Sequence, residues 1–458
     1  MTGPDTSAAS GCLHFETALL PGGWARNVRV QYTGGMIDNV VSGVAADPLC
    51  ERHKIGLPGM PNLHSHAFQR GFAGLTESRT RQDDSFWTWR ERMYAFVERL
   101  GPEDLEAISA QAFVEMLESG FTHVGEFHYL HKAADGDFDN PAEMSAAIVA
   151  AAEDTGIGLT LLPVYYAHSG FGGLPPKEAQ ARFVTTRDEY DRLLGQCREL
   201  SKGRHNMVIG VAPHSLRAVT EAELLDVIQL AGDAPVHIHI AEQQGEVGDC
   251  LAWSGQRPVC WLFDHAPVNE RWCLIHATHA DDLEIASIAK SGAVVGLCPI
   301  TEANLGDGIF PLEGFLAAGG RFGIGSDSNV SIGCAEELRL LEYGQRLSTR
   351  RRNIMVSDVS PSVGRTLFDG ALAGGAQALG TRSGLEAGCS ADIIALRADH
   401  PGLYCRTADA LLDSFVFASS NGMIDDVWRG GKKLVHNGRH IRRRAIAGRF
   451  RKSLRKLL

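Results

Sequence analysis

Residues 236–242, Val-His-Ile-His-Ile-Ala-Glu, are the stretch that decides the fold. Positions 236–240 have the length and composition of a short strand, and Glu242 falls in the loop that follows it. Residues at positions i and i+2 of a strand project from the same face, so His237 and His239 share one face. His239 lies nearer the carboxyl end of the strand, which is where barrel enzymes keep their active sites. This predicts His239 as a functional residue and His237 as a hydrogen-bonded packing residue.

Similar apolar runs recur through the middle of the chain, separated by longer helical patterns. The runs lie at 158–164, 207–211, 273–275, 293–297 and 321–324, and the helical patterns lie at 103–119, 143–155, 187–201 and 221–231. Strand–helix alternation repeated this often predicts an α/β fold with a parallel sheet covered by helices. Over about 300 residues roughly eight such units fit, which is the size of a (β/α)8 TIM barrel.

The two ends of the chain have a different pattern. Short β-type runs broken by Gly, Asp and Asn lie before Pro58 and again from about 385 to 440; they include 27–32, 392–396, 414–418 and 426–435. These ends form either two separate segments or one small composite β domain that brings both termini together.

The last twenty residues, 439–458, carry nine Lys or Arg and no acid. We expect a C-terminal helix whose charges face solvent, and the alternative is an anion-binding tail. The apolar residues expected to pack inward are Ile446, Phe450, Leu454 and Leu457.

Composition and charge exclude several classes of protein. The 458 residues include 44 Lys or Arg and 55 Asp or Glu, a net charge of −11, and 44% are hydrophobic. This is globular composition, and its acidic balance argues against nucleic acid or an anionic membrane as a partner. No apolar run reaches 18 residues, and the first residues lack the blocks of a signal peptide, so a cytoplasmic protein is expected. The ten cysteines form no CxxC pair and are expected to be reduced, mostly buried thiols.

Four predicted strand ends carry side chains that bind metals. They are His64-Ser-His66 after Pro58-Gly-Met-Pro-Asn-Leu, His239, His276 after Cys273-Leu-Ile, and Asp327 after Gly323-Ile-Gly-Ser. A lone His or Asp at a strand end is usually structural, but four successive ones are hard to ascribe to chance. Imidazole and carboxylate ligands suit a catalytic zinc or iron ion that keeps a position open for water.

With these motifs the sequence resembles the amidohydrolase superfamily. The matching elements are 58–66, His239-Ile-Ala-Glu242, His276 and Ser326-Asp327-Ser, while 385–394 and 427–432 look like halves of the family's terminal β-sandwich. The resemblance covers nearly the whole chain. It implies a (β/α)8 barrel at 58–384, a small composite β-sandwich from 1–57 and 385–440, and a homodimer. The basic, helical tail expected from the residues themselves then occupies 441–458.

No Lys stands at 206–213, where binuclear members place a carbamylated lysine, so the chain looks like the mononuclear deaminase branch. By that similarity one divalent ion, zinc or alternatively iron(II), is bound by His64, His66, His239 and Asp327. The similarity gives proton-transfer and electrostatic work to Glu242 and His276, and makes Asp327 the acceptor of a proton from the attacking water. For Glu242 the alternative is a solvated loop acid.

Within that branch the sequence is most similar to the formimidoylglutamate deiminase family. The stretches that carry the similarity are 66–71, 86–94, 126–129, 212–219 and 299–308. It implies hydrolysis of N-formimidoyl-L-glutamate to N-formyl-L-glutamate and ammonia, a reaction of histidine degradation. The residues that it assigns to the glutamate end of this small dicarboxylate are Gln69, Arg90, Tyr129, His214 and Arg217. Arginine suits that role because its planar fork binds carboxylate through two parallel hydrogen bonds.

Several alternatives stay open at this point. Arg90 could simply stack on Trp87 or Trp89, and the long segment 68–101 is either a lid over the site or a fixed surface insertion. The nearest alternative function is a mononuclear zinc aminohydrolase that acts on a purine, pyrimidine or triazine ring. A catalytically inactive scaffold relative is a further alternative, although such a protein is expected to lack the ligands.

Overall fold

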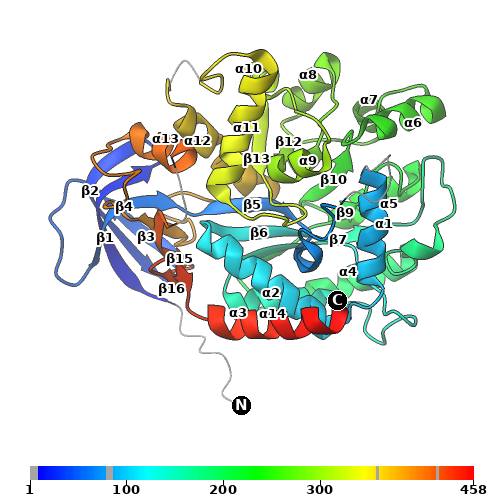
Figure 1. Ribbon diagram of the computed structural model, residues 1–458, viewed down its shortest axis with the longest axis horizontal. Coiled ribbons are helices and arrows are strands. Elements are labelled where there is room, and N and C mark those ends of the chain that lie inside the picture. The colour runs from blue at the N-terminus through cyan, green and yellow to red at the C-terminus, as the bar shows by residue number, and fades with distance from the viewer. Residues whose placement is uncertain (1–8, 79–85, 357–359, 419–421) are drawn as a thin grey trace.

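A closed barrel of parallel strands forms the centre of the computed structural model, which describes residues 9–78, 86–356, 360–418 and 422–458 (Figure 1). Its strands are β5 (Met60–Ser65), β6 (Phe121–His128), β7 (Gly158–Tyr165), β8 (Met207–Ile209) with β9 (Ala212–Pro213), β10 (Val236–Ile240), β11 (Trp272–His276), β12 (Val294–Leu297) and β13 (Arg321–Ile324). Neighbours pair in parallel within two sheets, β5 to β9 and β10 to β13. Parallel bridges Val211–Val236 and Ser65–Asp327 join the two sheets into a ring. The predicted (β/α)8 barrel is confirmed.

Helices cover the outside of this ring. They are η1 (Ala67–Phe72), α1 (Phe86–Val97), α2 (Pro102–Glu118), α3 (Glu143–Thr155), η2 (Glu178–Gln180), α4 (Arg187–Ser201), α5 (Glu221–Ala231), α6 (Gln244–Ser254), α7 (Pro258–His265), α8 (Asp282–Ser291), α9 (Pro299–Leu305), α10 (Leu312–Ala317), α11 (Cys334–Thr349) and α12 (Val363–Ala378). Capping boxes fix the starts of α4, α5 and α8, where Thr186, Thr220 and Asp281 each pair with a Glu three residues later.

Strands from both ends of the chain form one further sheet, coloured blue and orange to red beside the barrel in Figure 1. Its order is β17 (Arg439–His440), β16 (Lys432–His436), β15 (Ile424–Arg429), β14 (Ile393–Leu396), β4 (Glu51–Pro58), β1 (Gly11–Leu20), β2 (Gly23–Thr33) and β3 (Met36–Val41). Phe15, Val28, Ile393 and Trp428 belong to its separate buried core. The composite β-sandwich built from both termini is confirmed, and β4 leads through Gly59 directly into β5 of the barrel.

The prediction of a β-type run at 414–418 is wrong. Residues 414–417 belong to helix α13 (Asp409–Phe417), whose buried side chains include Leu411, Leu412, Phe415 and Val416. That spacing covers one face of a helix, and a short apolar run cannot by itself separate strand from helix. The run at 426–435 divides into β15 and β16 because Gly430 and Gly431 turn the chain with φ of 52° and 70°.

Two cysteines also differ from expectation. Cys12 and Cys50 form a disulfide, so the prediction of reduced thiols is wrong for this pair. The reason lies in the register of the sheet: β1 and β4 pair in parallel with Leu13 opposite Glu51, which places the preceding residues side by side. The other eight cysteines are free, and Cys405 is exposed.

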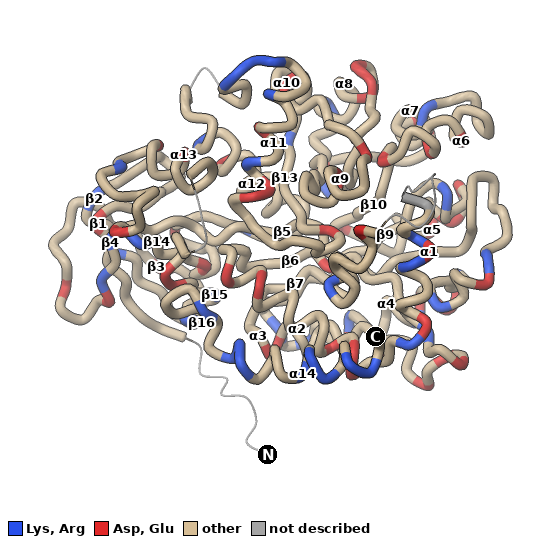
Figure 2. The backbone as a smooth tube through the Cα atoms, viewed as in Figure 1, with Lys and Arg blue, Asp and Glu red and all other residues tan. Residues whose placement is uncertain are grey.

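The basic C-terminal segment forms α14 (Arg443–Leu457), which lies along α2 and α3. Ile446 and Leu457 are buried, and Phe450 and Leu454 are partly buried. Its charges do not simply face solvent, because the segment lies beside helices that carry acidic residues (Figure 2). The ion pairs join Arg443 to Glu118, Arg442 and Arg449 to Asp154, and Lys456 to Asp104. In the described parts of the chain, no helix has the length and apolarity that a bilayer span requires.

Candidate active site

The backbone turns sharply at the carboxyl ends of three barrel strands, beside the predicted metal ligands. Ala241 after β10, His276 at the end of β11 and Asp327 after β13 have φ of 49°, 68° and 44°. Left-handed conformations are costly for residues other than glycine, and they persist where surrounding contacts enforce them. At Asp327 those contacts come from β5, because the Asp327 N–H donates to the His64 carbonyl at 3.0 Å and the His66 N–H donates to the Asp327 carbonyl at 2.8 Å.

Three imidazoles and one carboxylate converge at this point. His64 Nε2 lies 3.1 Å from His239 Nε2 and 3.5 Å from Asp327 Oδ1, and His66 Nε2 lies 3.3 Å from the same oxygen. All four side chains are buried. Burial lowers the pKa of His64 to about 3 and also lowers the pKa values of His66 and His239, so these rings are neutral at pH 7.

This cluster fits a divalent metal ion. The Nδ1–H groups of His66 and His239 donate to the carbonyls of Phe127 and His214 at 2.9 and 3.1 Å, which leaves the Nε2 lone pairs directed at the cluster. Bonds of 2.0–2.2 Å at tetrahedral angles require donor atoms roughly 3.3–3.6 Å apart, close to the separations observed here. His64 differs, since its Nδ1 is buried without a hydrogen-bond partner among the residues that the structure describes.

A polar network fixes the two ligand-bearing loops behind the cluster. Asn62 donates to Ser326 Oγ at 2.7 Å and accepts from the Ser326 N–H at 3.0 Å. Ser326 Oγ donates to Asn329 Oδ1 at 2.7 Å, and Asn329 donates to Ser65 Oγ at 3.1 Å. These buried side chains tie β5 to the loop after β13. Asn62, Ser65 and Ser326 stand inside the motifs 58–66 and Ser326-Asp327-Ser, but their role could not be predicted from those motifs alone.

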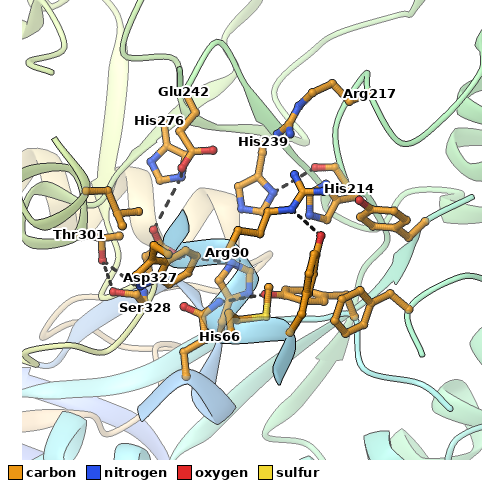
Figure 3. A pocket seen from close by; sticks show the side chains of 18 residues that line it. His66, Arg90, His214, Arg217, His239, Glu242, His276, Thr301, Asp327 and Ser328 are labelled. Atoms are coloured by element: carbon orange, nitrogen blue, oxygen red, sulfur yellow. Dashed lines mark hydrogen bonds and ion pairs between the residues drawn. The ribbon is translucent and has the colours of Figure 1, made fainter. Parts of the chain in front are cut away.

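Glu242 and His276 lie next to one another beside Asp327 (Figure 3). His276 Nε2 is 3.7 Å from both Glu242 Oε1 and Asp327 Oδ2. Burial raises the pKa of Glu242 despite the nearby His276 and Arg217. Burial would lower the pKa of His276, but the surrounding carboxylates of Glu242, Glu302 and Asp327 outweigh burial and raise it. A carboxylic acid that holds its proton near neutral pH is suited to general acid–base chemistry.

A pocket opens above this cluster, and the residues predicted to bind the glutamate end line it. These residues are Gln69 from η1, Arg90 from α1, Tyr129 after β6, and His214 and Arg217 after β9. Gln69 donates to Tyr129 Oη at 2.9 Å, and His214 Nδ1 lies 3.1 Å from Ser215 Oγ. Figure 3 shows Arg90 and Arg217 entering from different elements near His214. Burial and these two guanidinium groups lower the pKa of His214.

Tyrosines complete the part of the pocket around the arginines. Arg90 donates to Tyr94 Oη, and its guanidinium lies 5.3 Å from the centre of that ring. Trp89 packs against Phe72 instead, and the Trp87 side chain lies outside the described residues. Part of the 68–101 segment, residues 79–85, also lies outside them. Sequence reasoning missed Tyr94 on α1 and Tyr166, which both line the pocket. No spacing relates Tyr94 to the predicted ligands, whereas Tyr166 directly follows β7, and that position at a strand end is the signal that could have identified it.

Comparison with known proteins agrees with this geometry. The family described as "Amidohydrolase family" matches residues 55–434, and the domain described as "Formimidoylglutamate deiminase HutF, N-terminal domain" matches residues 11–54. A formimidoylglutamate deiminase of Pseudomonas aeruginosa is 52% identical over 97% of this chain and 98% of its own length. A 5-methylthioadenosine/S-adenosylhomocysteine deaminase of Natronomonas pharaonis is 28% identical over 83% of this chain and 81% of its own length.

Solved structures show the same relationship. An amidohydrolase from Brucella melitensis superposes with a TM-score of 0.94 at 52% identity and covers 98% of this chain and 99% of that chain. An adenosine deaminase from Xanthomonas campestris with bound zinc superposes with a TM-score of 0.82 at 22% identity over 98% of both chains, which shows the shared fold. The extent of the family match, the identity to these relatives and the ligands at the barrel's strand ends together show that the chain belongs to the amidohydrolase family.

Proposed function

We propose that the protein is a hydrolase that converts N-formimidoyl-L-glutamate and water into N-formyl-L-glutamate and ammonia, a step of histidine degradation. The observation that carries the proposal is the presence of two guanidinium groups, Arg90 and Arg217, in one pocket with the metal-ligand cluster. A doubly negative substrate needs such cations, whereas a purine or triazine ring needs flat apolar walls and amide groups. The relative in Pseudomonas aeruginosa, named for this activity, supports the assignment.

The proposed metal is one zinc ion, held by His64, His66, His239 and Asp327, with iron(II) as the alternative. Three neutral imidazoles and a carboxylate form a suitable donor set, and zinc is bound in the solved adenosine deaminase of the same fold. When bound, the ion lowers the pKa of a water molecule and so supplies a nucleophile at neutral pH.

Three side chains, those of Asp327, His276 and Glu242, transfer or orient the protons of the proposed reaction. Asp327 accepts a proton from the attacking water, and His276 holds the water oxygen through a hydrogen bond while it adds to the formimidoyl carbon. Glu242 delivers a proton to the imino nitrogen, and a second proton transfer makes ammonia the leaving group. The bond between the formimidoyl carbon and the glutamate nitrogen stays intact. Arg90, Arg217, Tyr129, His214 and Gln69 hold the glutamate end.

Ammonia release by the zinc-loaded full chain tests this proposal. The substrates are N-formimidoyl-L-glutamate, its aspartate analogue and guanine, each assayed with the metal content of the protein measured in parallel. We expect ammonia from the first compound, with a kcat/KM at least about 10³-fold above that for guanine. Guanine is neutral and would leave the guanidinium groups of Arg90 and Arg217 without carboxylate partners. A metal-loaded protein that releases no ammonia from the first compound, or prefers guanine, would refute the assignment.

Three further properties complete the proposal. The domain limits are 1–57 with 385–440, 58–384 and 441–458, which the separate buried core of the terminal sheet supports. A cytoplasmic location fits a substrate that is a free small metabolite, and a homodimer follows from the likeness to the superfamily. Fractionation of cells and light scattering of the purified protein test the last two.

A further inference from the structure

The motif 299–308 has no role in the mechanism proposed so far, yet it forms a short helix against the active site. This helix, α9, begins at Pro299 directly after β12 and Cys298. Thr301 Oγ1 and Ser328 Oγ hydrogen-bond to each other at 2.9 Å, and the Ser328 N–H donates to Thr301 Oγ1 at 3.2 Å. The helix is therefore fixed against the loop that carries Asp327.

The residue after Thr301, Glu302, contacts a different part of the active site, the His276 ring. Its Oε1 atom accepts a hydrogen bond from the Cys298 N–H at 2.9 Å and lies 3.2 Å from His276 Nδ1. Glu302 is 5% exposed and, as far as the described residues go, is not among those lining the pocket. Among the described residues, His276 is the active-site side chain that lies within hydrogen-bonding distance of the Glu302 carboxylate.

The geometry leaves one arrangement for the His276 ring. A backbone N–H is an obligatory donor, so the Cys298 N–H holds Oε1 in place as an acceptor. A carboxylate oxygen that already accepts one hydrogen bond can also accept the Nδ1–H of His276, which requires that Nδ1 carries a proton. The other nitrogen, Nε2, then faces Glu242 and Asp327 at 3.7 Å from each.

We propose that Glu302 is a positioning residue for the reaction: through the Cys298 N–H···Oε1···H–Nδ1 His276 chain it holds the Nδ1 proton and the ring plane of His276, so that Nε2 points into the gap between Glu242 and Asp327. The inference rests on the proposed function for its effect on turnover. The structural part, a fixed Nδ1–H, stands without it. Supporting hydrogen bonds of this kind around metal sites are typically worth about 10–100-fold in activity.

Kinetics of the zinc-loaded enzyme test the effect on turnover. We expect Glu302→Ala to lower kcat about 10–100-fold with KM within about 3-fold and an unchanged zinc content. Glu302→Gln should restore most of the loss, because an amide oxygen can accept both hydrogen bonds. The matched control is Glu337→Gln, since Glu337 is a buried acid that accepts the Ile300 N–H of the same helix at 2.9 Å. This control should keep kcat within about 2-fold, because the hydrogen bond that Glu337 accepts comes from the backbone of α9 and from none of the groups that move protons in the proposed reaction.

A double-mutant cycle tests whether Glu302 acts through His276. In the His276→Ala background, adding Glu302→Ala should cause no further loss of kcat, because the ring that Glu302 holds is gone. A further loss similar to that in wild type would overturn the proposal. A normal kcat in Glu302→Ala, or a kcat in Glu302→Gln as low as in Glu302→Ala, would also overturn it.

Nitrogen NMR of ¹⁵N-histidine-labelled, metal-free protein gives a readout that is independent of activity. We expect a protected Nδ1–H signal that disappears in His276→Ala, weakens or broadens in Glu302→Ala, and stays in Glu302→Gln and Glu337→Gln. An unchanged signal in Glu302→Ala would overturn the positioning role. If wild type releases no ammonia but the signal behaves as expected, the proposed function fails while the hydrogen-bond chain stands.

Discussion

Arg182 anchors the end of the helix that carries Arg90, and its replacement gives a graded test of the glutamate-binding pocket. The side chain is 9% exposed and donates from Nε to the Lys132 carbonyl at 2.9 Å, from Nη2 to the Leu100 carbonyl at 2.8 Å, and from Nη1 to the Val97 carbonyl. Val97 is the last residue of α1. Burial lowers the pKa of Arg182 to about 10, so the group stays charged at neutral pH.

The size of the effect follows from these three carbonyls. Val97 O keeps a second donor, the Leu100 N–H at 3.1 Å, so its loss costs little. The Leu100 carbonyl is buried and loses a charged donor, which costs about 1–3 kcal/mol, whereas the Lys132 carbonyl is only partly buried and its loss costs less. We therefore expect Arg182→Ala to lower the free energy of unfolding by about 1–4 kcal/mol. Release of the α1 end should also let Arg90 leave its fixed position in the pocket. Loss of a complete carboxylate contact costs about 1.5–3 kcal/mol, so partial loss should raise KM about 3–10-fold.

Urea unfolding and steady-state kinetics with N-formimidoyl-L-glutamate measure the two effects on the same samples. Arg182→Lys should lie between wild type and Arg182→Ala, because one ammonium group cannot reach all three carbonyls. Arg192→Ala on α4 is the control, since that arginine is exposed and its one hydrogen bond within the described parts of the chain is a 3.4 Å contact with the Asp188 carbonyl. An Arg182→Ala protein that is destabilised but keeps the wild-type KM would refute the link between this anchor and Arg90.

Four other predictions follow from the same structure. Glu242→Gln should lower kcat about 10²–10⁴-fold and keep the zinc content measured by mass spectrometry; near-normal turnover would remove Glu242 from the mechanism. Arg217→Ala should raise KM about 10–150-fold with a smaller change in kcat, and an unchanged KM would contradict its role. Cys12→Ser should lower the free energy of unfolding by about 4 kcal/mol, because the disulfide closes a loop of 38 residues; urea titration with and without reductant checks this. Burial would raise the pKa of Asp426, but the hydrogen bond from Lys433 outweighs burial and lowers that pKa. The ionised Asp426 therefore stabilises the fold above pH 3.8, and this contribution is lost as pH falls. The Tm difference between wild type and Asp426→Asn should accordingly shrink below about pH 4.

Local patterns predicted much of the barrel from sequence. The 236–240 and 321–324 runs and the 143–155, 187–201 and 221–231 helices have the bounds that the structure shows. These elements carry their own signals, a buried run of strand length or a capped amphipathic repeat. The 414–418 run lacked such a signal, because its helix depends on Leu411 and Leu412 upstream and on packing within the terminal domain. The Cys12–Cys50 bond depends on strand register, which no local pattern encodes.

The candidate site could be predicted where its residues follow strands. His64, His66, His239, His276 and Asp327 lie at carboxyl ends that a barrel topology brings to one rim. Residues that reach the same rim from outer elements carry no such positional signal. Tyr94 on α1 and Glu302 on α9 come close to the site only through the packing of side chains, which differs from one connecting segment to the next.

The pairing of β4 with β14 has a consequence for the order in which the strands become paired while the chain is synthesised. Pro58 lies opposite Ile393 in the sheet, and β4 continues directly into the strand that carries His64 and His66. At roughly 5–20 residues per second, a ribosome needs about 17–67 s to travel between those two partners. Throughout that interval one edge of β4 has no neighbour from its own chain, so the nascent polypeptide presents an open template for chaperones or for a second nascent copy. Strand β4, which leads into the strand that carries His64, is thus among the first parts synthesised and among the last to gain both of its neighbours.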